Sequence, residues 1–267
     1  MFNTILTLMR IVIILTLFGW TISCVSPSSV QPMVEKPVVA MNYALFFTAA
    51  NEAYVDCGDN SELQMGSHDL TVEFWLKTSA SGVQRIVGNG GSGASDADGY
   101  SIWILSNGQI RAGLSDGTTS EGKQNNSMVV TDGNWHHCAV VFERGDQLRV
   151  YVDGDWQGKL FPGVNNCDNT NDTFVLGRKS TTNSAQSYTG NLDEVRIWNT
   201  ALTGTVIADW RKKEVNDSHP NISDLQIYYK CNEGTGTTAN DVSSNAYKSN
   251  GIIYNAQWVK SDIPEFK

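Results

Sequence analysis

The stretch from Asp132 to Gly154 constrains the fold most, because it predicts a long β-hairpin with a turn at each end. Residues 135–142 form a continuous run of strand-favouring residues, and residues 143–146 supply a turn with a glycine. Along the return strand, residues 148–152, apolar and more polar side chains alternate, so the hairpin has one apolar face. A face of this length needs a second layer to cover it, which predicts two packed sheets.

Similar short strand patterns, separated by turn residues, recur through the rest of the chain. In residues 69–77 the alternation places Thr71, Glu73, Trp75 and Lys77 on the face opposite the apolar side chains. The other predicted strands are residues 44–47, 53–57, 85–88, 100–105, 109–114, 157–161, 173–177, 192–198, 225–231, 251–254 and 256–259. The predicted loops are residues 89–99, 115–127, 163–172, 181–188 and 232–250. This pattern is typical of an all-β antiparallel sandwich or jelly roll.

One segment, residues 203–213, has a helical pattern. Val206, Ile207 and Trp210 follow helical spacing, and Thr203 precedes them as a possible N-cap. We therefore expect one short helix near residues 203–213.

The N-terminus predicts export. Residues 1–23 read as a signal peptide, since the apolar run after Arg10 is about a dozen residues long and short for a membrane span. It ends in a small residue directly before Cys24, as in a bacterial lipoprotein box, although Thr21 stands where leucine is usual. Lipidation at Cys24 is the preferred hypothesis, and an ordinary cleaved signal is the alternative. Residues 24–41 contain three prolines and read as an extended tether.

Four further cysteines lie in the part of the chain after the tether: Cys57, Cys138, Cys167 and Cys231. Export would place them where disulfides can form, and four cysteines allow three pairings that the sequence cannot distinguish. Three of them lie in apolar strand patterns, where cysteine behaves as a small hydrophobic residue. We expect buried thiols with at most one bridge. The spacing of the cysteines matches no zinc motif.

The formal charge of −9 argues against a nucleic-acid partner, because phosphate binding needs clustered basic residues. The acidity has two interpretations: solubility, or oxygen ligands for a hard cation such as Ca²⁺.

Four ordered stretches resemble the laminin-G-like domains of the concanavalin A-like lectin/glucanase superfamily. They are residues 44–55, 70–77, 132–154 and 190–199, and residues 228–236 resemble a segment often found beside such domains. The resemblance spans about residues 42–267 and implies one jelly roll of twelve to fourteen strands in two curved sheets. The chain departs from the family pattern at Thr48-Ala49 and Ala53, and it carries Cys57, Cys138 and Cys231 at apolar positions.

The resemblance to glucanases raises the question of catalysis, which needs two carboxylates flanking one glycosidic bond. The nearest pair is Asp193 and Glu194, and adjacent strand residues are expected to point to opposite faces. We therefore expect a protein without enzymatic activity, with an unusual glycan hydrolase as the least favoured alternative.

The resemblance also implies a structural Ca²⁺, bound by an aspartate of a late strand and by an early turn. Asp193 is the metal ligand to expect by this resemblance, with Asn51 as a contributor. The alternative is that Asp193 bonds loop amides and binds no metal.

Sugar rings stack on exposed aromatic side chains, and Trp103, Trp156 and Tyr188 lie at or near predicted loops. Trp75, Trp135 and Trp198 lie inside regular strands and are expected in the core. We therefore expect a cell-surface binding module for carbohydrate, and the alternative is an adhesion module for a protein partner. A lipid anchor would hold it on the cell membrane or outer membrane; otherwise it would be secreted.

Overall fold

The computed structural model describes residues 42–64, 66, 68–90, 99–125, 128–160, 167, 173–264 and 266. The predicted signal peptide, Cys24 and the tether lie outside the described residues. None of the helices in these ranges is long and apolar enough to span a membrane. Residues Met41–Lys267 form one compact unit.

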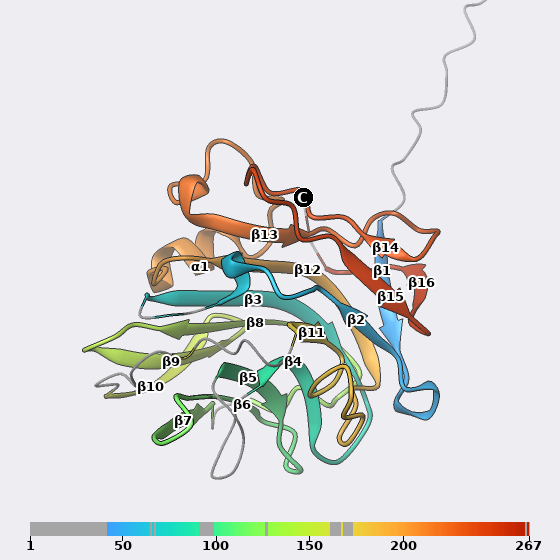
Figure 1. The fold of residues 1–267 in the computed structure, drawn as a ribbon, viewed down its shortest axis with the longest axis horizontal. Helices are drawn as coiled ribbons and strands as arrows, with labels where there is room; N and C mark the ends of the chain where they lie inside the picture. The colour runs from blue at the N-terminus through green and yellow to red at the C-terminus, as the bar shows by residue number, and fades with distance from the viewer. Residues whose placement is uncertain are drawn as a thin grey trace, which may run out of the picture. The chain divides into compact units, whose positions relative to one another are not determined.

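The predicted hairpin lies within the first of two eight-stranded sheets, here called sheet A (Figure 1). Cys138 pairs with Val152 and Phe142 with Leu148, so the hairpin register is as the alternation predicts. The strands of sheet A, in spatial order, are β10 (Asp155–Leu160), β9 (Gln147–Val152), β8 (Trp135–Phe142), β3 (Leu70–Lys77), β12 (Gly190–Trp198), β1 (Tyr43–Phe47) and β16 (Gln257–Lys260), with β13 (Leu225–Tyr229) paired to β12.

The second sheet, sheet B, covers the apolar face of sheet A. Its strands, in spatial order, are β14 (Thr238–Ala239), β15 (Gly251–Tyr254), β2 (Tyr54–Asp56), β11 (Val175–Leu176), β4 (Gln84–Gly90), β5 (Gly99–Ile104), β6 (Ile110–Ser115) and β7 (Ser120–Gln124). All these strand pairs are antiparallel, which confirms the predicted all-β sandwich. The sixteen described strands exceed the twelve to fourteen that the resemblance implies.

Two predicted loops were wrong in part. β7 lies in the predicted loop 115–127, and β14 lies in the predicted loop 232–250. β7 is an edge strand whose side chains are exposed or half-buried, so its sequence is polar and shows no apolar alternation. Backbone pairing to β6, and not a buried face, makes it a strand.

The main core lies between the sheets. It contains Phe74 of β3, Val140 of β8 and Val150 of β9, all fully buried. The four described cysteines are buried and free, which confirms buried thiols and leaves no disulfide among them. Burial raises the pKa of Cys57 to about 12, so this thiol is protonated at neutral pH.

The outer face of sheet A is also covered, and this covering positions the candidate site. The helix α1 (Gly204–Trp210) packs Ile207 against Val141 and Trp198. The side chain of Thr203 accepts a hydrogen bond from the Val206 amide, as the predicted N-cap requires. Three single-turn 3₁₀ helices complete the described elements: η1 (Ala49–Asn51), η2 (Ser61–Leu63) and η3 (Ile222–Asp224).

Candidate functional site

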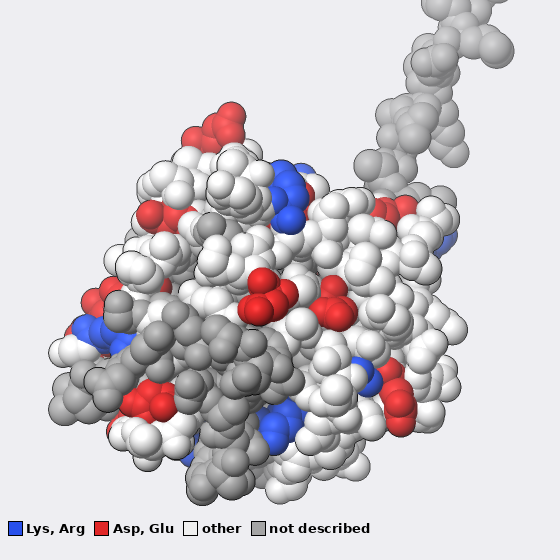
Figure 2. Space-filling view, viewed as in Figure 1, with Lys and Arg blue, Asp and Glu red and all other residues white. Residues whose placement is uncertain are grey.

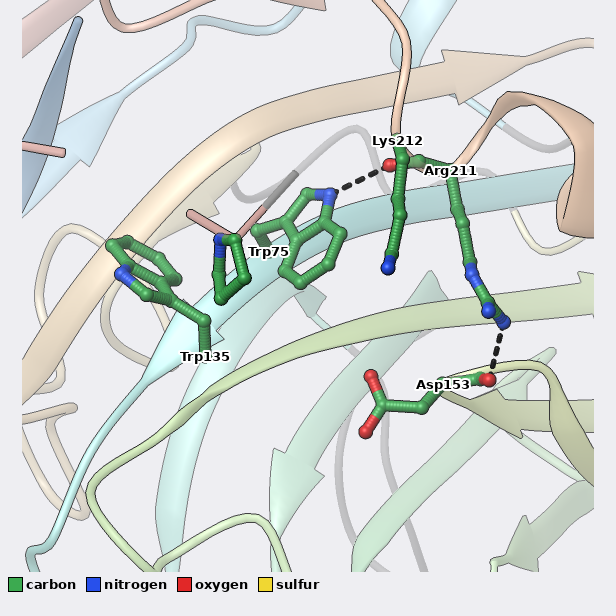
Figure 3. Close-up of a pocket in the computed structure, with 6 residues that line it drawn as sticks. Trp75, Trp135, Asp153, Arg211 and Lys212 are labelled. Carbon is green, nitrogen blue, oxygen red and sulfur yellow. Dashed lines mark hydrogen bonds between the residues drawn. The ribbon is translucent and has the colours of Figure 1, made fainter. Parts of the chain in front are cut away.

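A pocket of about 200 Å³ opens on the outer face of sheet A, between the strands, the segment after α1 and the C-terminal tail (Figure 3). The residues that line it are Trp75, Trp135, Asp153, Arg211, Lys212 and Pro264. Figure 2 shows acidic and basic side chains of the described residues scattered over the face in view, without a large patch of one charge.

Two indole rings form the apolar wall of the pocket. The Trp75 Nε1–H donates to the Arg211 carbonyl at 2.8 Å, and the Trp135 Nε1–H donates to Asp262 Oδ1 at 2.6 Å. Both rings pack with Ala44 and Ile263, and they are only 4% and 8% exposed. The wall is therefore fixed before any ligand arrives, and it shows only part of each ring to solvent.

The cations of the pocket stand on a short segment that the outer face of sheet A holds in place. Arg196 of β12 donates from Nη1 to the Trp210 carbonyl at 3.2 Å and from Nη2 to the Lys213 carbonyl at 2.7 Å. With the Trp75 bond to the Arg211 carbonyl, three carbonyls of residues 210–213 accept hydrogen bonds from strand side chains. These bonds satisfy carbonyls at the C-terminal end of α1 and fix the backbone of Arg211 and Lys212.

Asp153 supplies the carboxylate of the pocket from the two-residue turn between β9 and β10. Asp153 and Gly154 have φ of 53° and 93°, the left-handed conformation that an Asp-Gly hairpin turn uses. Asp153 Oδ1 accepts from the His137 amide at 2.9 Å, and the guanidinium of Arg211 donates to the Asp153 carbonyl. The turn is thus tied to the Arg211 side chain through the backbone carbonyl of Asp153, and to β8 through its carboxylate.

His136 joins Asp153 to a second carboxylate. Its Nδ1 lies 2.7 Å from Asp153 Oδ2, and its Nε2 lies 3.0 Å from Asp132 Oδ1. The hydrogen bond to Asp153 raises the pKa of His136 above its usual value, against the opposing effect of burial. Burial opposes a low pKa at Asp132 too, but hydrogen bonds from Asn134 and His136 lower it to about 2. When His136 is protonated, its charge offsets part of the negative charge at the pocket.

Beneath α1 lies a buried polar network that the sequence did not predict. Arg196 pairs with Glu194 at 2.8 Å, Trp198 Nε1–H donates to Glu73 Oε2 at 2.8 Å, and the Tyr228 hydroxyl donates to Glu194. Burial raises the pKa of both glutamates, while Arg196 acts in the opposite direction. Both carboxyls are bonded to protein groups and lie outside the set that lines the pocket.

The expectation that Asp193 and Glu194 point to opposite faces was wrong. The β3–β12 register shifts between Asp193 and Arg196, and Glu194 has a left-handed φ of 52°. This bulge places both carboxyls on the outer face, where Asp193 bonds Ser261 and Glu194 bonds Arg196.

The predicted calcium ligands share no described contact. Asp193 is fully buried; its Oδ2 accepts from the Ser261 hydroxyl at 2.6 Å and its Oδ1 from the Glu194 amide at 2.9 Å. Asn51 is exposed in η1, and its carbonyl accepts from Asn255. An N–H group cannot ligate a cation, so a Ca²⁺ at Asp193 would compete with that donor. The described ranges hold no group of three or more His, Cys, Asp or Glu suited to a metal. Calcium binding at these residues stays a prediction.

The three predicted sugar-stacking residues differ in their surroundings. Tyr188 is fully buried and its hydroxyl donates to the Asn191 carbonyl, while Trp103 lies inside β5 between the guanidinium groups of Arg85 and Arg111. Tyr188 offers no face for stacking, so that prediction needs correction: proximity to a loop in the sequence did not leave its ring exposed. Trp103 is 9% exposed, no less than the two indoles of the pocket, and stacking there stays a prediction. Trp156, on the edge strand β10, is 46% exposed and stays a prediction.

Sequence reasoning missed the pocket, although one signal pointed to it. In the alternation of β3, Trp75 falls on the same face as the polar residues and opposite the apolar ones, and this places it on the outer face of sheet A. Trp135, expected in the main core, pairs with Lys77 and lies on that same outer face. The contributions of Arg211, Lys212 and Pro264 depend on how distant segments meet, which no local pattern encodes.

Comparison with known proteins gives consistent results. Residues 49–208 match the model of a family described as the concanavalin A-like lectin/glucanases superfamily. A rat protein named sushi, von Willebrand factor type A, EGF and pentraxin domain-containing protein 1 is 24% identical in an alignment of 155 residues. The match covers 51% of this chain and 4% of that protein. This chain thus spans only a small part of that relative.

Two solved structures share the fold. A proposed carbohydrate binding protein from Bacteroides ovatus has a TM-score of 0.63 and 17% identity, over 85% of this chain and 62% of the other. A heptameric SAP-like pentraxin from Limulus polyphemus has a TM-score of 0.54 and 13% identity, over 86% of this chain and 99% of the other. At these identities the likeness concerns the fold, which confirms a concanavalin A-like sandwich.

Proposed function

Because this chain belongs to the concanavalin A-like lectin/glucanases superfamily, we propose that it is a non-catalytic binding module whose ligand is a carbohydrate, held in the pocket of Trp75, Trp135 and Asp153. The family includes lectins and glucanases alike, so the function must be argued from the site. The observation that carries the proposal is the combination, in one pocket, of two fixed indole rings, one oriented carboxylate and two cationic side chains.

The chemistry of the pocket suits a sugar. Indole surfaces pack on the apolar C–H face of a pyranose ring, and charged side chains accept from or donate to its hydroxyls. The volume of about 200 Å³ is below the range of about 300–1,000 Å³ that holds drug-sized ligands. A ligand portion about the size of one sugar ring fits this space. The Bacteroides ovatus protein of the same fold is described as a proposed carbohydrate binding protein, and this supports the proposal at the level of fold.

A second candidate function is adhesion to a protein partner. Tyr54 and Tyr254 stack at 4.6 Å on the outer face of sheet B, beside Ile252. Ile252 and Tyr254 are 45% and 43% exposed, so this face presents apolar side chains to solvent. A glycan hydrolase is the least favoured function, since Glu73 and Glu194 are buried and bonded within the protein.

Export and lipid attachment at Cys24 complete the proposal. The lipoprotein-like sequence at Thr21–Cys24 supports it, and the proline-containing tether would hold the module away from the membrane. Mass spectrometry of the protein purified from membranes tests the lipid attachment. We expect a diacylglyceryl group on Cys24, and a mature protein that begins at another residue and carries no lipid would contradict the proposal.

A glycan array probed with the purified protein and two variants tests the carbohydrate function. Asp153→Asn keeps the left-handed turn, because Asn-Gly is a preferred pair there, but removes the charge. We expect at least about a tenfold loss of glycan binding by a variant that still folds. Asp155→Asn, an exposed carboxylate two residues along, is the matched control and should bind as wild type does. Binding of no glycan, with capture of a protein ligand instead, would favour the adhesion function.

A further inference from the structure

We propose that the sugar held in this pocket is acidic: it carries a carboxylate that the Arg211 and Lys212 side chains bind, while Asp153 accepts one of its hydroxyls. This inference rests on the proposed carbohydrate function and narrows it to a class of ligand.

The charge of the pocket differs in sign from that of the chain. The whole protein has a formal charge of −9, yet the residues lining the pocket include two cations and one carboxylate. Figure 3 shows the Lys212 ammonium and the Asp153 carboxylate on the side of the Trp75 ring, while the Arg211 guanidinium points to the Asp153 backbone carbonyl. A carboxylate entering the pocket meets an excess of positive charge.

The single carboxylate of the pocket has partners of its own. Asp153 accepts from the His137 amide, and its second oxygen lies 2.7 Å from His136. His136 bridges Asp153 to Asp132, and its protonation, which these hydrogen bonds favour, offsets part of the Asp153 charge and reduces the repulsion of an anionic ligand. The contacts with His137 and His136 use one lone pair on each oxygen of the Asp153 carboxylate. Because a carboxylate can accept about four hydrogen bonds, Asp153 can still accept one from a sugar hydroxyl.

The segment that carries the two cations is pre-organised, and so is the Arg211 side chain. Arg211 donates to the Asp153 carbonyl, which holds its guanidinium at the pocket wall. A guanidinium has five N–H donors, so this bond leaves capacity for a ligand carboxylate. The backbone of both cations is fixed by Arg196 and Trp75 from the sheet. Binding therefore requires little ordering of residues 210–213. This lowers the entropic cost of forming charge-assisted hydrogen bonds to a ligand carboxylate.

The test compares acidic glycans with their carboxyl methyl esters, which keep the same backbone but remove the charge. Titrations use wild type, Lys212→Gln and the control Lys248→Gln, an exposed lysine between β14 and β15 of sheet B. We expect wild type to bind the acid at least about tenfold tighter than the ester, Lys212→Gln to lose most of that preference, and Lys248→Gln to keep it.

Each other outcome overturns a separate statement. Equal binding of acid and ester by wild type would refute the acidic ligand and leave the carbohydrate function standing. Binding of neither, on an array that also carries neutral glycans, would refute the carbohydrate function itself. A preference that persists in Lys212→Gln, or that Lys248→Gln loses equally, would show that the general charge of the surface and not this pocket selects the acid.

Discussion

Arg196 connects the buried network beneath α1 to the pocket, and replacing it with methionine tests this connection. Its guanidinium pairs with Glu194 and donates to the carbonyls of Trp210 and Lys213, which flank the pocket cations. Methionine keeps the apolar stem and removes the charge and all three hydrogen bonds. Glu194 and Glu73, both about 1% exposed, then lie beside no guanidinium.

Breaking a buried ion pair on one side costs about 3–5 kcal/mol, because the remaining charge stays buried without compensation. The free energy of unfolding of a domain is ordinarily about 5–15 kcal/mol, so Arg196→Met removes a large share of the stability. For a domain of this size the loss corresponds to a melting temperature lower by about 6–20 °C. Urea unfolding and thermal melting measure it, with Lys248→Met as the control that changes stability by no more than about 0.5 kcal/mol.

Two further readouts separate this account from a general packing defect. Adding Glu194→Gln to Arg196→Met removes the stranded charge and should restore part of the stability. Because burial raises the pKa of Glu73 and Glu194 in the folded state, the variant should also regain stability relative to wild type as pH falls and these carboxyls take up protons. A loss below about 1 kcal/mol, or no recovery with Glu194→Gln, would refute the reasoning.

Three other predictions follow from single sites. A Cβ on Gly190, which has φ of 153°, would lie 2.5 Å from both the Lys77 carbonyl oxygen and the Tyr188 hydroxyl. Gly190→Ala should therefore lower the free energy of unfolding, measured with urea, by at least about 1–3 kcal/mol, and a variant as stable as wild type would contradict this. The pKa of His136 is raised in the folded state, so the stabilising effect of its charge is complete below about pH 6.5 and is lost as pH rises through that raised pKa. The difference in stability between wild type and His136→Gln should therefore shrink from about pH 6 to about pH 9. A difference that stays constant would exclude a stabilising bridge between His136 and the two carboxylates. If Ca²⁺ binds at Asp193, a chelator should lower the melting temperature of the wild-type protein, and an unchanged value would remove calcium from the account.

The architecture of this chain could be predicted because it depends on local alternation. The hairpin of β8 and β9, the alternating face of β3 and the N-cap of α1 each carry their signal within a few residues. Strands that pair through backbone alone, such as β7, carry no such signal, and their sequence predicts a loop. Fold was therefore predictable wherever a buried face determines the sequence.

The site was less predictable, because its geometry depends on contacts between distant segments. The bulge that turns Asp193 and Glu194 to one face requires a left-handed glutamate, a conformation that sequence alone does not suggest for this residue type. Burial of Tyr188 and of Trp103 depends on neighbouring strands and loops. The two histidines of β8 both contact Asp153 of the pocket, and no local pattern shows that they meet this distant turn.

The most direct test of the central claim is a crystal structure of the protein with an acidic glycan that it binds. The account predicts a sugar ring against Trp75 and Trp135, with a hydroxyl on Asp153 and a carboxylate on Arg211 and Lys212. A glycan bound elsewhere, whether against the exposed ring of Trp156 or on the tyrosines of sheet B, would contradict it.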